Sequence, residues 1–395
     1  MNRLALFCCA VSCFGLCPGF AHAETSVSGY IKSFAIAQED NLGLPERYLS
    51  QNTGRFMLDA FKGKAVFQLH YEVSPVFMNR PLTVDPATFN PAGGSYRLTD
   101  IKQPLSGDKP DDKRSVYQNL DRFNVQLQLE GGDLTLGRQA ITFGSARVIN
   151  PTDVFLPFDV RTFNTEYRNG VDALRFQKPV GELGEVDVGL VLGDDAGRET
   201  SAAFLQLRGN VNGKDLHFAL IEYAEQTLVG AGLESALGSF GFWLEAAAVD
   251  GDESYVRLST GLDYAFSEDT FGLIEYHYNG AGSRDPADYL GLLRGLAHQR
   301  GGVFLLGENY LVPGLTWQAS PLWSLSAQAI VNLDDSSAFA SVAAEYNVAE
   351  NFYMDFGYYW FIGDEPIAAA NGLPSLASEY GADPNTLYAS IRWYF

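Results

Sequence analysis

The end of the chain alternates strictly between apolar and polar side chains. In segment 386–395, TLYASIRWYF, Leu387 and Ile391 fall on one face, and Ser390 and Arg392 fall on the other. A period of two residues predicts a β-strand with one apolar face and one polar face. In a soluble sandwich this aromatic strand would need a buried position, because a free edge invites aggregation. A closed barrel pairs its last strand with its first, and we therefore expect a transmembrane antiparallel β-barrel of the bacterial outer membrane.

The same segment resembles the C-terminal targeting signature of outer-membrane barrels. Phe395 is the terminal residue, and Trp393 stands two positions before it on the same face. The resemblance implies that Trp393 and Phe395 act as the assembly signal. It also implies the barrel-assembly machinery as a partner, and outer-membrane lipid and lipopolysaccharide as surroundings.

Residues 1–23 have the organisation of a secretory signal peptide. Arg3 precedes the apolar run 4–15, and 21–23 read Ala-His-Ala, a small-x-small cleavage site. The apolar run is too short to span a bilayer. Cys13 raises a lipoprotein signal as an alternative, but the leading Leu of that motif is missing. All four cysteines lie within this segment, so we expect a mature chain without disulfides.

The charge of the chain excludes one class of partner. Lys and Arg number 27 against 48 Asp and Glu, a net charge of −21, or 26 − 48 = −22 without Arg3. A chain this acidic is a poor ligand for nucleic acid. Acidic outer loops would be tolerated beside lipopolysaccharide that is bridged by divalent cations.

Alternating segments recur along the rest of the chain. About 18 of them follow Thr25, with 16 as a possible count, and each is near the ~10 residues of a tilted membrane strand. The clearest are 123–130, 255–264, 323–332 and 352–360. Their polar faces are too hydrophilic for a sandwich core. An all-β fold with an apolar exterior around a wet lumen accounts for both faces.

The connections between these segments alternate between short and long. Short links such as 131–133 and 267–269 contain Gly, Asn or Asp, as tight turns require. The long links all have the opposite parity, which predicts one barrel domain, 24–395, with its long loops outside the cell. The predicted long loops are 38–52, 75–119, 144–167, 279–301 and 363–385.

The most distinctive stretch is 137–175. A strand ending Gly-Arg-Gln leads into a loop with Pro-x-Asp-Val-Phe, and the return strand begins Arg-x-Gly-Val-Asp-Ala. The residues of these motifs are Gly137, Arg138, Gln139, Pro151, Asp153, Val154, Phe155, Arg168, Gly170, Val171, Asp172 and Ala173. The stretch resembles a signature of proteobacterial porin-like proteins grouped around the alginate-export family. The resemblance implies a monomeric barrel of about 18 strands that passes solutes, which for alginate exporters are polyanionic polysaccharides.

The loop 144–167 is rich in apolar residues and stiffened by Pro151 and Pro157. We expect it to fold into the barrel and narrow the lumen, where its charges would either contact solute or pin the loop by pairing. Both roles stay open. Arg138 shares a face with Leu136, so a bulge or the end of the membrane zone must intervene there. The candidate pore and constriction residues are Arg138, Arg147, Asp153, Asp159, Arg161, Glu166, Arg168, Asp172, Arg175, Arg208, Arg257 and Arg392.

No metal or enzyme motif stands out. The four histidines after the signal lie on separate segments without ligand spacing. Acidic turns at 250–253 and 334–335 match no complete Ca²⁺ loop and are expected to be solvated. Glu275 and His277 share a strand face, but no nucleophile accompanies them. We expect no cofactor and no enzymatic activity.

These patterns together predict a passive porin or export channel for small or polymeric anionic solutes. Its constriction would be the loop 144–167, and a monomer is the favoured state. Two alternatives remain. One is a barrel sleeve around a partner in a secretion or electron-transfer complex, and the other is an outer-membrane hydrolase.

Overall fold

In the computed structural model, the described residues are 24–40, 45–80, 96–101, 104–107, 109, 112–155, 166–368 and 374–395. Two candidate residues, Asp159 and Arg161, lie outside these ranges, as does the predicted signal. Within the described ranges, no helix has the length and apolar character needed to cross a membrane.

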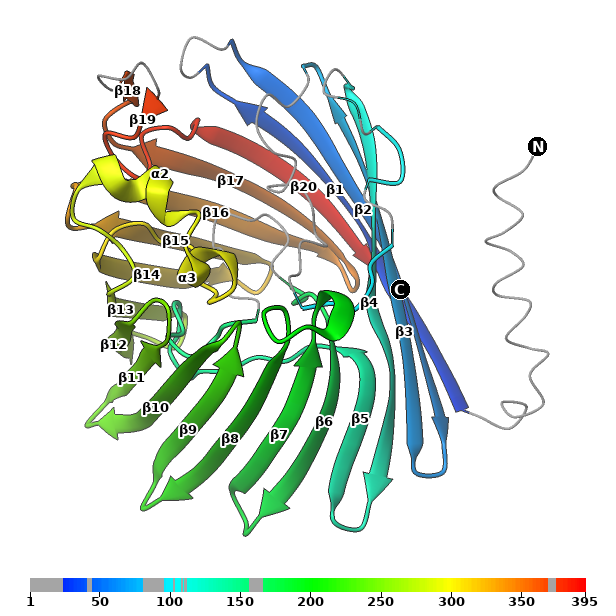
Figure 1. Cartoon of the computed structure of the whole chain (residues 1–395). Coiled ribbons are helices and arrows are strands. Elements are labelled where there is room, and N and C mark those ends of the chain that lie inside the picture. The colour runs from blue at the N-terminus through cyan, green and yellow to red at the C-terminus, as the bar shows by residue number, and fades with distance from the viewer. Residues whose placement is uncertain are drawn as a thin grey trace.

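Eighteen antiparallel strands of the described chain form one closed sheet. Their bounds are β1 Glu24–Gln38, β2 Arg47–Lys62, β3 Ala65–Met78, β4 Arg114–Leu129, β5 Gly132–Gln139, β6 Val171–Val180, β7 Gly184–Leu192, β8 Ala202–Val211, β9 Lys214–Tyr223, β10 Gln226–Leu237, β11 Phe240–Asp250, β12 Tyr255–Ala265, β13 Thr270–Asn279, β14 Asn309–Ser320, β15 Trp323–Asn332, β16 Ala338–Ala349, β17 Phe352–Ile362 and β20 Thr386–Tyr394. Successive strands pair from β1 to β17, and β20 closes the ring between β17 and β1 (Figure 1). The predicted antiparallel β-barrel of about 18 strands is confirmed.

The closing seam uses the last residue of the chain and a glycine. The Gly29 N–H donates to the Phe395 carbonyl over 2.9 Å, and the Phe395 N–H donates to the Gly29 carbonyl over 3.0 Å. A Cβ at position 29 would lie 2.2 Å from the Arg55 carbonyl oxygen, so a larger residue would force the strands apart. Trp393 and Phe395 are about half exposed on the outer face. Their role as an assembly signal stays a prediction.

Exposed apolar side chains alternate with enclosed ones along the strands. In β1, Ile31 is 52% exposed while Tyr30 and Lys32 are 0% and 1% exposed. In β12, Val256 is exposed and Arg257 is buried. This places apolar groups toward lipid and polar groups toward the interior, as a membrane barrel requires.

The connections at one end of the barrel are all short, and every long connection lies at the other end (Figure 1). Backbone pairing between neighbouring strands extends further toward the long connections than the strand ends predicted from the apolar pattern. Residues 47–52 pair with β1, and Pro75 lies within β3 opposite Val116. The predicted ends of the first two long loops are therefore wrong, because hydrogen-bonded strands extend past the apolar band. The five connections predicted to be long cover 39–46, 79–113, 140–170, 280–308 and 363–385, and the β7–β8 connection 193–201 at the same end is longer than the first of them.

Two of the five connections contain short elements. The connection 280–308 includes η3 Pro286–Asp288, α2 Tyr289–Leu292 and α3 Leu296–Gln299. The connection 363–385 includes the strands β18 Ile367–Ala368 and β19 Pro374–Ser375.

Two apolar clusters fill part of the barrel interior. In the first, Phe143 and Phe155 of the β5–β6 connection meet Phe204 of β8, with the Phe143 and Phe204 ring centroids 5.1 Å apart. In the second, Ile149 of the same connection is buried in one cluster with Tyr310 of β14. The β5–β6 connection therefore contributes to both clusters, and its apolar side chains find burial inside the barrel.

Candidate pore constriction

The β5–β6 connection is attached to the inner wall through buried carboxylates. Glu245 of β11 is 0% exposed, and it accepts backbone N–H groups from three residues of the connection. Ser145 donates over 2.6 Å and Ala146 over 3.0 Å to one carboxylate oxygen. Thr152 donates to the other oxygen, with its N–H at 2.9 Å and its hydroxyl at 2.7 Å. One glutamate thus holds both ends of the segment 145–152.

Glu275 of β13 holds the middle of that segment and is also 0% exposed. It accepts the N–H groups of Arg147 at 3.1 Å, Val148 at 3.2 Å and Ile149 at 2.8 Å. The indole N–H of Trp243 donates to it over 2.9 Å. Charge-assisted hydrogen bonds of this kind are stronger than neutral ones, so the segment is fixed to the wall at these points.

Two β12 side chains bind the carbonyl groups of the same segment. The Ser259 hydroxyl donates to the Ile149 carbonyl over 2.5 Å, and the Arg257 guanidinium donates to the Pro151 carbonyl over 3.2 Å. Strands β11, β12 and β13 therefore satisfy both donors and acceptors of a non-repetitive backbone within the barrel.

Arg147 is the exposed cation of the docked segment. Its guanidinium lies 2.7 Å from Glu234 of β10 and 3.2 Å from Asp263 of β12. It also lies 5.3 Å from the ring centre of Trp243. The Arg147 side chain is 40% exposed, so it presents charge to the lumen while its backbone is held by Glu275.

The returning part of the connection reaches a different sector of the wall. Glu166 lies 2.9 Å from the Lys32 ammonium of β1 and 3.1 Å from the Arg392 guanidinium of β20. Tyr167 stacks on Tyr30 with ring centroids 5.8 Å apart. The connection thus starts at β5, is bound at β11–β13, touches β20 and β1, and ends at β6.

Neighbouring charges set the ionisation of Glu166. Burial acts to raise the pKa of this carboxyl, but hydrogen bonds from Tyr394 and Lys32 outweigh it and lower the pKa below its ordinary value. Glu166 is therefore ionised in the docked arrangement. Asp153 and Arg168 pair with each other across the connection.

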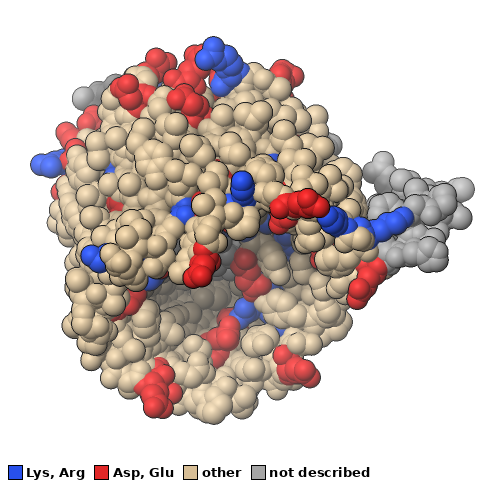
Figure 2. Space-filling model, turned by 90° about the horizontal axis from the view of Figure 1, so that it is seen from below, with Lys and Arg blue, Asp and Glu red and all other residues tan. Residues whose placement is uncertain are grey.

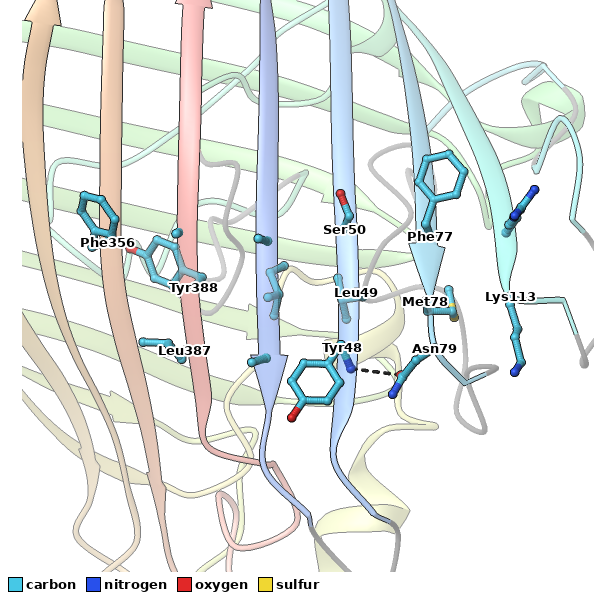
Figure 3. Close-up of a pocket in the computed structure, with 15 residues that line it drawn as sticks. Tyr48, Leu49, Ser50, Phe77, Met78, Asn79, Lys113, Phe356, Leu387 and Tyr388 are labelled. Carbon is cyan, nitrogen blue, oxygen red and sulfur yellow. Dashed lines mark hydrogen bonds between the residues drawn. The ribbon is translucent and has the colours of Figure 1, made fainter.

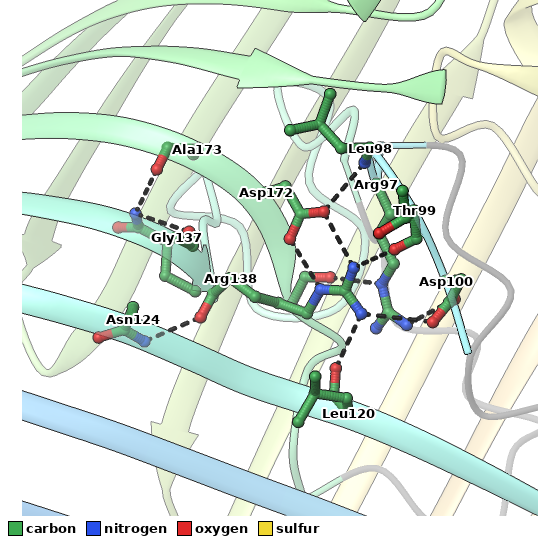
Figure 4. Close-up of polar contacts among 12 residues, drawn as sticks. Arg97, Leu98, Thr99, Asp100, Leu120, Asn124, Gly137, Arg138, Asp172 and Ala173 are labelled. Carbon is green, nitrogen blue, oxygen red and sulfur yellow. Dashed lines mark hydrogen bonds and ion pairs between the residues drawn. The ribbon is translucent and has the colours of Figure 1, made fainter. Parts of the chain in front are cut away.

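Arg138 and Asp172 pair at the end of β5 and β6, away from the lumen-facing side. Asp172 is two residues from the outward-facing Leu174, and Arg138 is two from the outward-facing Leu136. The Arg138 guanidinium donates to Asp172 over 2.7 and 2.9 Å and to the Thr99 carbonyl (Figure 4). This ion pair holds the connection in place, as expected for charges that pin the loop by pairing. The charged side chain of Arg138 lies on the apolar face because the membrane zone ends there.

The remaining candidates occupy separate places on the inner wall. Arg175 pairs with Asp187, 2.6 Å away on β7, while Arg208 is exposed on β8. Arg392 pairs with Asp355 over 2.6 Å and also with Glu345. The candidates thus do not converge on one cationic cluster.

Carboxylates outnumber cations on the inward positions toward the short connections. Figure 2 shows acidic and basic side chains around and inside the opening at this end. Among the described strand residues, the inward-facing carboxylates here are Asp59, Glu72, Asp121, Asp133, Glu185, Asp187, Asp215, Glu234, Asp263, Glu345 and Asp355, and the inward-facing cations are Lys32, Arg55, Arg122, Arg175, Arg208 and Arg392.

The two glutamates that hold the segment were not among the residues predicted from sequence. Glu275 was considered beside His277 as part of a hydrolytic site, but it accepts backbone groups of the connection instead. His277 is 1% exposed and its Nδ1 lies 2.8 Å from the Ser259 hydroxyl. The sequence feature that could have identified them is a Glu at an inward-facing strand position of this acidic chain. Among the described residues, no group of three acidic or histidine side chains is placed to hold a metal ion.

Comparison with known proteins gives a match in structure but not in sequence. No family model matches the chain, and no curated protein matches it. Acinetobacter baumannii OccAB4 is 10% identical, with 94% of this chain and 98% of that chain covered and a TM-score of 0.57. Pseudomonas aeruginosa OprD is 12% identical, with 95% and 97% covered and a TM-score of 0.55. Pseudomonas aeruginosa OpdK, solved with vanillate, is 8% identical, with 94% and 98% covered and a TM-score of 0.56.

The chain therefore has the 18-stranded fold of outer-membrane porins and is a β-barrel of the bacterial outer membrane. The broader resemblance to porin-like barrels is confirmed, and the structures named above are of the OprD and Occ type, so the alginate-export family itself is not shown. A sequence identity of 8–12% to these structures shows only that the fold is shared.

Proposed function

We propose that the protein is a passive outer-membrane channel for small solutes, narrowed by its β5–β6 connection. The observation that carries this proposal is the attachment of segment 145–152 to Glu245 and Glu275 on the inner wall. A fixed, water-facing constriction in a wide barrel selects solutes by size and by the charges that line it. Arg147 on the segment and Arg208 and Glu345 on the wall are exposed charged groups placed to contact a passing solute.

The charges favour cationic or zwitterionic solutes over anionic ones. Arg147 is balanced by Glu234 and Asp263, and Arg392 by Glu345 and Asp355. Because the arginines are paired and further carboxylates face the lumen, a polyanion would meet net repulsion. The predicted anionic preference and the alginate-like polymer therefore have no support in this arrangement, and we propose small cations and zwitterions instead.

Two rival functions fit the interior less well. A sleeve needs its lumen for a partner, whereas the β5–β6 connection and two apolar clusters occupy that space here. A hydrolase needs a reachable nucleophile, whereas Ser259 and His277 are 0% and 1% exposed and Ser259 binds the Ile149 carbonyl.

The proposed function also requires export of the chain and a defined orientation of the barrel in the membrane. We propose that residues 1–23 are removed on export, that the long connections lie outside the cell, and that Trp393 and Phe395 engage the assembly machinery. We also propose that the barrel works as a monomer in contact with lipopolysaccharide.

Single-channel recording in a planar bilayer tests the channel function. The refolded protein is compared with a variant in which 144–167 is replaced by a short Gly/Ser link, and with a control that carries the same change at 193–201. We expect discrete conductance steps that become larger only in the first variant. A reversal potential in a KCl gradient should show cation preference. Absence of steps from folded protein of all three kinds would overturn the channel, and anion preference would overturn the proposed solute class.

A further inference from the structure

The outer wall of the barrel carries a groove at the end with the long connections. The groove has a volume of about 790 Å³ and crosses the outer face of β20, β1, β2 and β3. Its floor contains the small side chains of Ala35, Ala37 and Ala389. Phe356 and Leu387 form one side, and Phe77 and Tyr48 form the other (Figure 3). These four large side chains are between 44% and 55% exposed, which places the groove on the lipid-facing surface.

Basic side chains cluster at the outer end of this groove. Lys113 and Arg114, at the start of β4, line it directly, and Phe77 is paired with Arg114 across the strands. Arg47 and Arg80 do not line the groove, because they lie two residues from Leu49 and Met78, which are buried in the barrel interior. The Tyr48 N–H donates to the Asn79 side chain over 3.0 Å, which brings these two strand ends together (Figure 3).

The two cations at the groove have no carboxylate partner in the part of the chain that the structure describes. Neither Lys113 nor Arg114 forms an ion pair there, and the nearby Glu46 carboxylate accepts the Tyr48 hydroxyl. In a chain of net charge −21, two adjacent cations without a carboxylate partner at the end of an apolar groove indicate an anionic ligand.

We propose that the groove binds a phosphorylated, acylated glycolipid of the outer leaflet, the lipid A class. One acyl chain lies over Ala35, Ala37 and Ala389, and a phosphate is bound by Lys113 and Arg114. A single ligand of this class supplies both the apolar chain and the anion that the two halves of the site require. Aromatic residues such as Tyr48 and Phe77 are typical of the surface where a barrel meets lipid headgroups.

A second copy of the chain is the other occupant to consider. A symmetric dimer through this face would place the same patch on both subunits. The two basic clusters would then approach each other and repel. The charge pattern therefore favours a lipid. This inference rests on the membrane orientation proposed above, but not on conduction of solutes.

Native mass spectrometry of the full barrel in detergent tests the proposal. The probes are diphosphoryl lipid A, dephosphorylated lipid A and phosphatidylethanolamine, each titrated into the refolded protein. We expect diphosphoryl lipid A to bind tightest. Lys113→Gln with Arg114→Gln should weaken it roughly ten-fold or more, since charged hydrogen bonds to phosphate are lost. Ala35→Phe should weaken binding of all acylated probes by filling the floor.

Controls separate the lipid site from folding and from the channel. Lys178→Gln with Lys214→Gln removes the same charge near the short connections and should leave lipid affinity unchanged. Conductance should be unchanged in every variant, because the groove faces lipid. The proposal is overturned by equal affinity for the three lipids, by equal affinity of wild type and the Lys113/Arg114 variant, or by cross-linked dimers that Ala35→Phe abolishes. Loss of conductance with intact lipid binding would count against the channel alone.

Discussion

Replacement of Glu245 by Gln should release the docked segment from the wall while keeping the side-chain size. Both carboxylate oxygens are used, one by Ser145 and Ala146 and the other by Thr152. An amide turns one of these acceptors into a donor, so one of the two groups of N–H donors loses its partner. Each buried donor without a partner costs about 1–3 kcal/mol, which gives about 2–6 kcal/mol when the Ser145 and Ala146 donors are lost.

Hydrogen exchange measures this release directly. At about 1.4 kcal/mol per factor of ten, protection of the amides in 145–152 should fall between roughly 30-fold and roughly 20,000-fold. Single-channel steps of the same variant should become larger and noisier. Glu253→Gln is a matched control, because Glu253 accepts the N–H groups of Leu296 and Ala297 in another connection. If protection of 145–152 and the conductance both match wild type, the carboxylate does not hold the segment and the reasoning fails.

Three further outcomes are expected. The lowered pKa of Glu166 means that its ionised form stabilises the docked connection at pH values above the ordinary glutamate pKa of about 4.3. This stabilisation is lost as the pH falls through the folded pKa, so channel noise should rise in acid. Glu166→Gln should be noisy at every pH. Arg147→Gln removes the cation that pairs with Glu234 and Asp263 and should raise the cation-to-anion permeability ratio, as measured from reversal potentials, roughly two-fold. This ratio corresponds to the loss of about 0.5 kcal/mol of charge pairing, as expected for a partly exposed ion pair. Arg138→Gln breaks a largely buried pair and should lower the free energy of unfolding in urea by about 3 kcal/mol, with unchanged conductance because the pair does not face the lumen.

The barrel was predictable because its two solvents impose a period of two on every strand. Alternation in segments such as 255–264 and 386–395 fixes which face meets lipid, and Gly- and Asn-rich turns mark the short connections. The strand ends were less predictable. Backbone pairing continues through the polar residues 47–52, where the apolar pattern has stopped, because hydrogen bonding between strands does not require a membrane.

The inward folding of the β5–β6 connection was predicted from its apolar content, and Ile149 and Phe155 are indeed buried inside the barrel. The side chains that bind its backbone were not predicted. Glu245 and Glu275 lie about 100 residues or more along the chain from the groups that they bind. A single sequence shows that these carboxylates face inward, but it does not show which loop lies opposite them.

The docked segment and the wall carboxylates depend on each other. Glu245 and Glu275 are fully enclosed, and an enclosed carboxylate without hydrogen-bond donors is costly. The backbone N–H groups of 145–149 and 152 are not paired in a helix or a strand and carry the same cost if they lose these acceptors. Undocking would therefore leave both sides unsatisfied or require water to enter between the segment and the wall. Because the wall carboxylates and the backbone N–H groups satisfy each other at these contacts, the arrangement favours a permanent constriction over a gate that opens and closes.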